Sequence, residues 1–138
     1  MGREPEVELL ELMLAELGEA PACLAVEGEP GIGKTHLLAE LRRRGDERRM
    51  LVLGGAAAEF ERDVPFAVWA DALDAYVASQ ESEELVPAPA RSELAGVLPT
   101  LASEGGEPPV DERYRTHRAV RALLERIAAR QTLILILD

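Results

Sequence analysis

The chain has few cysteines, no long apolar run and no recognisable signal sequence, which are the features of disulfide-bonded, membrane-spanning and secreted proteins. It has a single cysteine, Cys23, which excludes an internal disulfide, and the apolar residues around it predict a buried structural thiol. Its apolar runs, such as residues 133–137, are far shorter than the roughly 18 to 20 residues that cross a bilayer, so no membrane contact is expected. The N-terminus lacks the apolar stretch of a secretory signal, which predicts a cytoplasmic location.

Basic residues are also scarce. The chain has 15 Lys and Arg against 26 Asp and Glu, which gives a formal net charge of −11 at pH 7. Affinity for nucleic acid depends largely on neutralising phosphates, so direct nucleic-acid contact by this segment is not expected. A local arginine cluster at a predicted helix end is interpreted as a solvated helix terminus, where cations complement the dipole. Its members are Arg42, Arg43, Arg44, Arg48 and Arg49.

The 138 residues suffice for one globular domain or part of one, and hydrophobic periodicity divides them into alternating helices and strands. Helices are predicted over 5–17 with a stop at Gly18, from 33 to a stop at Gly45, over 66–77 behind Pro65, near 94–98, and over 111–130. Strands are predicted over 22–27, over 50–53 before Gly54 and Gly55, and over 132–138. This alternation predicts an α/β fold with a parallel sheet.

Residues 28–35, Gly-Glu-Pro-Gly-Ile-Gly-Lys-Thr, match the phosphate-loop pattern G-x-x-x-x-G-K-[ST] in full, between a predicted strand and a predicted helix. The glycines allow backbone N–H groups to turn inward around an anion, and the following helix adds the positive end of its dipole. A glycine turn that only caps a helix is the simpler alternative. The nucleotide-contact candidates are Gly28, Glu29, Pro30, Gly31, Ile32, Gly33, Lys34, Thr35 and the adjoining His36.

Two residue types in this pattern carry the expected chemistry. Lys34, the only lysine beside fourteen arginines, is expected to reach the β- and γ-phosphates, and the Thr35 hydroxyl is expected to ligate Mg²⁺. Residues 133–138 have the form of a Walker B element, an apolar strand that ends in an acid. Asp138 is therefore the second candidate for the metal, and ATP with Mg²⁺ is the expected cofactor pair.

The order of Gly2-Arg3-Glu4, the phosphate loop and the terminal Leu-Ile-Leu-Ile-Leu-Asp resembles the AAA-like ATPase domain of the STAND class, as found in large ATP-binding LuxR-family transcriptional regulators. The resemblance implies a three-layer P-loop NTPase, with a parallel sheet and flanking helices. Residues 1–138 would be its N-terminal part, from Walker A to Walker B and incomplete at the C-terminus. It also implies that Arg3 lies near the adenine and that other domains of a longer regulator are partners.

Two alternatives remain beside this interpretation. A small P-loop kinase would need arginines to clamp the transferred phosphoryl group, and Arg113, Arg115, Arg118 and Arg121 offer such a set, although their spacing suits a solvated helix face. A non-functional remnant is the other. The resembled family places a second acid directly after Asp138 as part of its hydrolytic machinery, so very slow hydrolysis is expected of this chain by itself.

Overall fold

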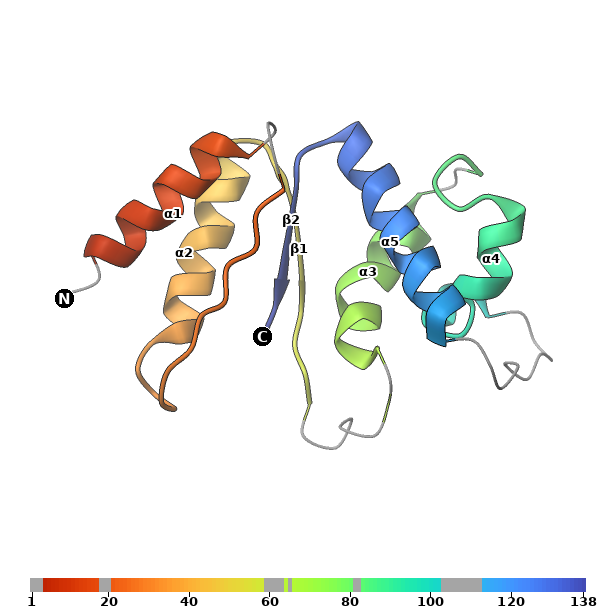
Figure 1. Cartoon of the computed structure of the whole chain (residues 1–138), viewed down its shortest axis with the longest axis horizontal. Coiled ribbons are helices and arrows are strands. Elements are labelled where there is room, and N and C mark those ends of the chain that lie inside the picture. The colour runs from red at the N-terminus through yellow and green to blue at the C-terminus, as the bar shows by residue number, and fades with distance from the viewer. Residues whose placement is uncertain (1–3, 18–20, 59–63, 65, 81–82, 103–112) are drawn as a thin grey trace. The chain divides into compact units, whose positions relative to one another are not determined.

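The computed structural model describes residues 4–17, 21–58, 64, 66–80, 83–102 and 113–138 (Figure 1). It divides the chain into two compact units, Met1–Val52 and Leu53–Asp138, called here the first and the second unit. Arg3 lies outside the described residues. None of the helices in the described part of the chain is both long enough and apolar enough to cross a membrane.

The first unit is built on two helices, α1 (Glu4–Glu16) and α2 (Lys34–Glu47), which pack against each other. Pro5 stands in the first turn of α1, where its missing N–H costs nothing. Leu10 and Leu14 of α1 and Leu37 of α2 are buried, as their helical spacing predicts. Both predicted helices are thereby confirmed.

The predicted stop of α2 at Gly45 is wrong, because the helix continues to Glu47. The chain leaves the helix at Arg49, which has a left-handed φ of 57°. The Arg49 N–H donates to the Asp46 carbonyl over 2.9 Å, and the Met50 N–H donates to the Gly45 carbonyl over 3.0 Å. These two bonds form a Schellman motif in which an arginine takes the position that glycine usually occupies.

The predicted strand over residues 22–27 is also wrong, since residues 21–29 form neither helix nor strand. A buried strand needs hydrogen-bonding neighbours on both sides, and an apolar run specifies burial without specifying such a partner. The described residues contain a sheet of two strands only, and this segment is not one of them. Cys23, predicted to be buried, is exposed for the same reason.

The sheet pairs β1 (Leu51–Gly55) with β2 (Leu133–Leu137). The Asp138 N–H donates to the Gly55 carbonyl over 2.9 Å, and the Ala57 N–H donates to the Asp138 carbonyl over 2.7 Å. Asp138 is thus bonded to Gly55 and Ala57, which are two residues apart on the neighbouring chain segment. This is the hydrogen-bond pattern of parallel strands, so the predicted parallel pairing is confirmed. Ile134 and Ile136 point into the core.

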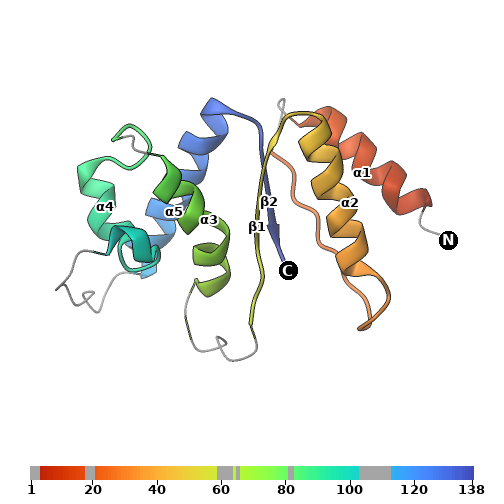
Figure 2. The same cartoon turned by 180° about the vertical axis from the view of Figure 1, so that it is seen from behind.

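Between these strands the second unit carries α3 (Ala67–Ser79), α4 (Ala88–Leu94), the short 3₁₀ helix η2 (Pro99–Leu101) and α5 (Arg113–Arg130). In both views α3, α4 and α5 lie on one side of β2 (Figures 1 and 2). Inward side chains of these helices and of the turns between them form the core of this unit, with Leu73, Leu85, Leu94, Leu98, Leu123 and Ile127 fully buried. An α/β organisation is thus confirmed, whereas the three-layer arrangement stays a prediction.

Gly55 allows α3 to lie directly on β1. A Cβ at this position would lie 2.1 Å from the Val68 carbonyl oxygen and 2.9 Å from the Ala72 nitrogen. Both contacts are far inside normal van der Waals separation. The absence of a side chain at Gly55 therefore sets the distance between this helix and the strand.

Candidate functional site

The loop of residues 28–33 turns through two left-handed glycines. Gly31 has φ 80° and Gly33 has φ 92°, conformations that cost an L-residue with a side chain roughly 1–2 kcal/mol. The Ile32 N–H donates to the Glu29 carbonyl over 3.3 Å and closes the turn. Both residues that adopt this conformation are glycines, and Gly33 is the second fixed glycine of the sequence motif.

Helix α2 begins directly at the end of this loop, and no side chain caps its N-terminus. Its first helical bond runs from the Leu37 N–H to the Gly33 carbonyl over 3.2 Å. Gly33 is the N-cap and offers no side chain for a capping bond, and the first turn contains no acid. The N–H groups of the first turn have no partner within a helix, so this end is suited to an anion.

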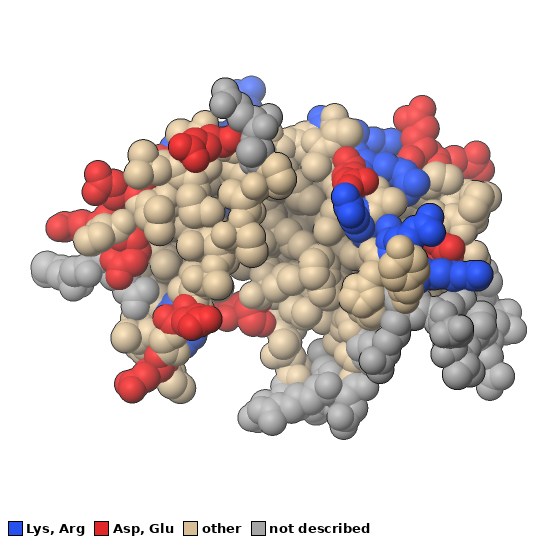
Figure 3. All heavy atoms as spheres, in the orientation of Figure 1, with Lys and Arg blue, Asp and Glu red and all other residues tan. Residues whose placement is uncertain are grey.

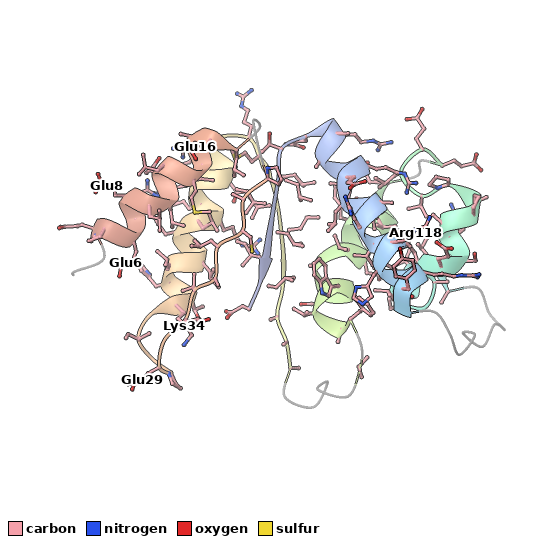
Figure 4. All side chains as sticks on the ribbon, viewed as in Figure 1. Glu6, Glu8, Glu16, Glu29, Lys34 and Arg118 are labelled. Carbon is pink, nitrogen blue, oxygen red and sulfur yellow. The ribbon has the colours of Figure 1, made fainter. Side chains whose placement is uncertain are left out.

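Lys34 folds back over the loop. Its Nζ donates to the Gly28 carbonyl over 2.8 Å and to the Glu29 carbonyl over 3.0 Å, and Figure 4 shows Lys34 and Glu29 at the same turn. A cation at a helix N-terminus is electrostatically unfavourable by itself, because the dipole there is positive. The two carbonyls hold the ammonium group where it can also meet an anion bound at the loop.

The residues next to Lys34 present their side chains to solvent. Thr35 and His36 are exposed on the first turn of α2, and Ile32 is 54% exposed at the loop. Exposed apolar and hydroxyl groups at this point are available to a ligand. The structure therefore brings together residues 28–36 of the predicted set in one continuous surface.

A groove runs from this loop between α1 and α2. Ile32, Gly33 and His36 line it on the side of the loop and α2. Glu4 and Val7, in the first turns of α1, line it on the other side. The residue before this helix is Arg3, which the resemblance placed beside the adenine and which lies outside the described residues. The described part of the groove has an apolar lining near the loop and carboxylates along α1.

An ion-pair network joins the two helices at the far part of this groove. Glu11 of α1 pairs with both Arg44 and Arg48 of α2. Glu40 pairs with Arg44 over 2.7 Å and with Arg43 over 2.6 Å. The hydrogen bond from Arg43 holds the pKa of the Glu40 carboxyl below its ordinary value of 4.5, and the same contact raises the pKa of Arg43. Three of the five arginines of the cluster, Arg43, Arg44 and Arg48, are therefore in ion pairs at this helix terminus.

Asp138 directly follows β2, and its backbone extends the ladder with β1 by one residue. Its side chain is exposed at the carboxyl end of the strand. Asp138 belongs to the second unit and the phosphate loop to the first.

The chemistry of the donors suits Mg²⁺. The Thr35 hydroxyl and the Asp138 carboxylate are hard oxygen ligands, and Mg²⁺ in nucleotide sites usually takes one or two protein oxygens with phosphates and water. In the described ranges no group of three or more His, Cys, Asp or Glu side chains could hold a metal by itself. Each of the two residues is therefore of a type that Mg²⁺ takes as a protein ligand beside a nucleotide.

The arginines that could serve a kinase are on α5 in the second unit. Arg115, Arg118 and Arg121 are exposed, and the Arg121 Nε lies 2.9 Å from Glu125. This is the solvated helix face that their spacing predicts. The side chain of Arg113 lies outside the described residues.

Sequence reasoning did not identify the Glu11 contacts or the role of Val7 in the groove. The spacing of Glu40 and Arg44, four residues apart on one helix, is a signal that could have indicated their pair. The contact of Glu11 with α2 depends on how two helices meet, and no local pattern encodes it.

Comparison with known proteins adds one match. The family model described as "AAA ATPase domain" matches residues 1–138. No curated protein and no solved structure matches the chain significantly.

Proposed function

Because this chain belongs to the AAA ATPase domain family, whose members are nucleotide-binding ATPases, we propose that it binds Mg²⁺-ATP at residues 28–36. One observation carries the proposal: the left-handed glycines, the uncapped start of α2 and the Lys34 ammonium group all meet at one loop. A triphosphate makes use of all three, because the glycine loop and the helix start offer N–H groups to its oxygens and the ammonium group offers a positive charge.

The triphosphate is proposed to lie in the loop with its oxygens toward the N–H groups of α2. Lys34 then exchanges its bonds to the Gly28 and Glu29 carbonyls for bonds to the β- and γ-phosphates. This exchange requires only rotation of a flexible side chain. Glu29, Pro30 and Ile32 shape the outer wall of the loop.

The base is proposed to lie in the groove between α1 and α2. Val7 and Ile32 offer apolar contacts for a flat ring, and His36 lines the same surface. The carboxylates of Glu4 and Glu8 make this region unfavourable for phosphate, which supports the orientation with phosphates at the loop and base toward α1. Arg3, directly before α1, is proposed to contact the nucleotide near its base.

Thr35 and Asp138 are proposed to hold the Mg²⁺ that accompanies the nucleotide. The ion would neutralise part of the phosphate charge when bound. Thr35 stands one residue beyond Lys34 in the first turn of α2, and Asp138 offers its carboxylate at the end of β2. Their oxygens fit the preference of the ion.

We further propose that residues 1–138 are the N-terminal part of a signalling ATPase of the STAND type, such as a LuxR-family transcriptional regulator. The order of Gly2-Arg3-Glu4, phosphate loop and Walker B strand supports this assignment. In such a protein, ATP and ADP differ in their contacts, so they bias the packing of the other domains. No observation on α5 favours the kinase alternative.

The metal and nucleotide parts of the proposal are tested by equilibrium dialysis with labelled ATP, with and without Mg²⁺. We expect Mg²⁺ to strengthen binding in the wild type and in Thr35→Ser, which keeps the hydroxyl, but to have little effect in Thr35→Ala and a reduced effect in Asp138→Asn. Competition with unlabelled ATP and GTP measures base preference. Equal Mg²⁺ dependence in Thr35→Ala and the wild type would contradict the assignment of Thr35.

A further inference from the structure

Charge is distributed very unevenly between two helices. Helix α1 carries five glutamates and no basic residue. Helix α5 carries six arginines and a single glutamate, although the chain as a whole has a net charge of −11. Figure 3 shows acidic side chains over α1 and basic side chains over α5. Two helices of one chain therefore present surfaces of opposite sign.

The basic side chains border a groove between α4 and α5. Small apolar residues line it, among them Pro89, Ala90 and Ala122, and Arg118 and Arg126 lie along its α5 side. Tyr114, at its edge, is 74% exposed. A groove with a shallow apolar surface and a cationic border is suited to a narrow helix with both apolar and acidic side chains.

Two of the three arginines that line the groove, Arg118 and Arg126, have unused hydrogen-bonding capacity. Arg126 Nη1 is buried without a hydrogen-bond partner, and Arg118 forms no ion pair, among the residues that the structure describes. Two acids also line the groove, Glu93 of α4 and Glu125, of which Glu125 pairs with Arg121 over 2.9 Å. A buried guanidinium nitrogen without a partner is costly, and an incoming carboxylate removes that cost if the Arg126 side chain turns so that Nη1 faces the groove.

The exposed face of α1 has the complementary pattern. Glu8, Leu12 and Glu16 are spaced by four residues and so lie on one face of the helix, with Leu9 beside them. Leu12 is 60% exposed and Leu9 is 48% exposed. Neither Glu8 nor Glu16, both labelled in Figure 4, pairs with a basic residue of the described segments.

The spacings match. Arg118, Ala122 and Arg126 follow one another at the same four-residue interval as Glu8, Leu12 and Glu16, so the outer pairs are each about 12 Å apart along their helices. We propose that α1 of a second copy of this chain docks along the α4–α5 groove. The two glutamates then meet the two arginines, and the leucine packs over the small alanine.

This contact joins two different surfaces, so it is heterologous. Each copy that engages a partner through α1 still has a free α4–α5 groove, and repeated contacts generate a ring or an open chain. Because the contact has a polar border of charges, its strength falls with salt. The inference does not rest on the proposed nucleotide binding, because neither surface includes the phosphate loop and the α1 face shares only Glu8 with the groove between α1 and α2.

The test is sedimentation equilibrium of the full chain over a range of concentrations, at about 0.05 M and about 0.5 M salt. We expect the wild type to self-associate more strongly at the lower salt concentration. Arg118→Glu alters the groove and Leu12→Asp alters the α1 face, and each is expected to weaken self-association about tenfold or more. Arg115→Glu is the matched control, because Arg115 is an exposed arginine of α5 that does not line the groove.

An equimolar mixture of the two variants distinguishes this contact from a symmetric one. The intact α1 of Arg118→Glu can dock on the intact groove of Leu12→Asp, so the mixture is expected to form a 1:1 pair while neither variant associates by itself. Both substitutions are at exposed positions, and unchanged thermal transitions establish that the variants fold. A monomeric wild type, no pairing in the mixture, or an equal loss with Arg115→Glu would each overturn the proposal.

Discussion

Replacing Gly55 by alanine introduces a methyl group where α3 lies closest to β1. The new Cβ would lie 2.1 Å from the Val68 carbonyl oxygen and 3.1 Å from the Ala72 Cβ. Carbon and oxygen normally approach no closer than about 3.3 Å, so the helix has to move by about 1 Å or the strand has to distort. The two closest atoms, the Val68 carbonyl oxygen and the Ala72 nitrogen, belong to backbone, which cannot rotate away as a flexible side chain can.

The expected cost follows from this displacement. Overpacking a close-packed interior costs about 1–3 kcal/mol and occasionally more, and a contact with backbone lies at the upper end of that range. We therefore expect Gly55→Ala to lower the free energy of unfolding by about 3 kcal/mol. For a chain of this size that is a decrease in Tm of roughly 10 °C.

Urea denaturation followed by circular dichroism measures this, and two other glycines provide controls. A Cβ at Gly96 has no atom within 4 Å, so Gly96→Ala is expected to be neutral or stabilising by about 0.4–1 kcal/mol. A Cβ at Gly31 has equal space, but its φ of 80° makes Gly31→Ala cost about 1–2 kcal/mol. If Gly55→Ala proves as stable as Gly96→Ala, the close helix–strand contact is refuted.

Three further predictions concern side-chain contacts. Asp74 accepts hydrogen bonds from the Thr100 N–H over 2.9 Å and from its hydroxyl over 2.8 Å, so Asp74→Ala should cost about 1–2 kcal/mol in urea denaturation. Glu11→Gln removes the pairing of α1 with α2 and should lower stability by about 1 kcal/mol, a difference that should shrink at high salt. The pKa of Glu40 lies below 4.5 because Arg43 donates to it, so its contribution is fully present above pH 4.5 and is lost as pH falls through the lowered pKa. Urea denaturation of Glu40→Gln over a pH series should therefore show a smaller acid-side decrease in stability than the wild type, and identical profiles would count against the contact.

Much of the fold could be predicted from local patterns. Apolar residues at helical spacing gave α1, α2, α3 and α5, because each of these helices buries one continuous face. The phosphate loop could be predicted because its chemistry restricts residue types at fixed spacing, and glycines are needed where φ is positive. Strand β2 could be predicted from the apolar run before Asp138, because a short run of this composition is typical of a strand that is buried in a sheet.

The errors occurred where structure depends on partners distant in the sequence. Residues 22–27 have the composition of a strand, but a strand exists only with a hydrogen-bonded neighbour. Gly45 was predicted to end α2, whereas the helix ends where Arg49 adopts the left-handed conformation. The contact of Gly55 with α3 and that of Glu11 with α2 both depend on how elements meet, and local sequence does not encode that geometry.

The central claim, that the loop of residues 28–36 binds the triphosphate of ATP, is tested most directly by isothermal titration of the chain with Mg²⁺-ATP. Lys34→Ala removes the ammonium group, and Arg115→Ala removes one exposed cation from the second unit as a matched control. A charge-assisted hydrogen bond is worth about 1.5–3 kcal/mol, so we expect Lys34→Ala to weaken binding roughly 10- to 150-fold and the control to bind like the wild type. Equal affinity of Lys34→Ala and the wild type, with both proteins folded, would contradict the claim.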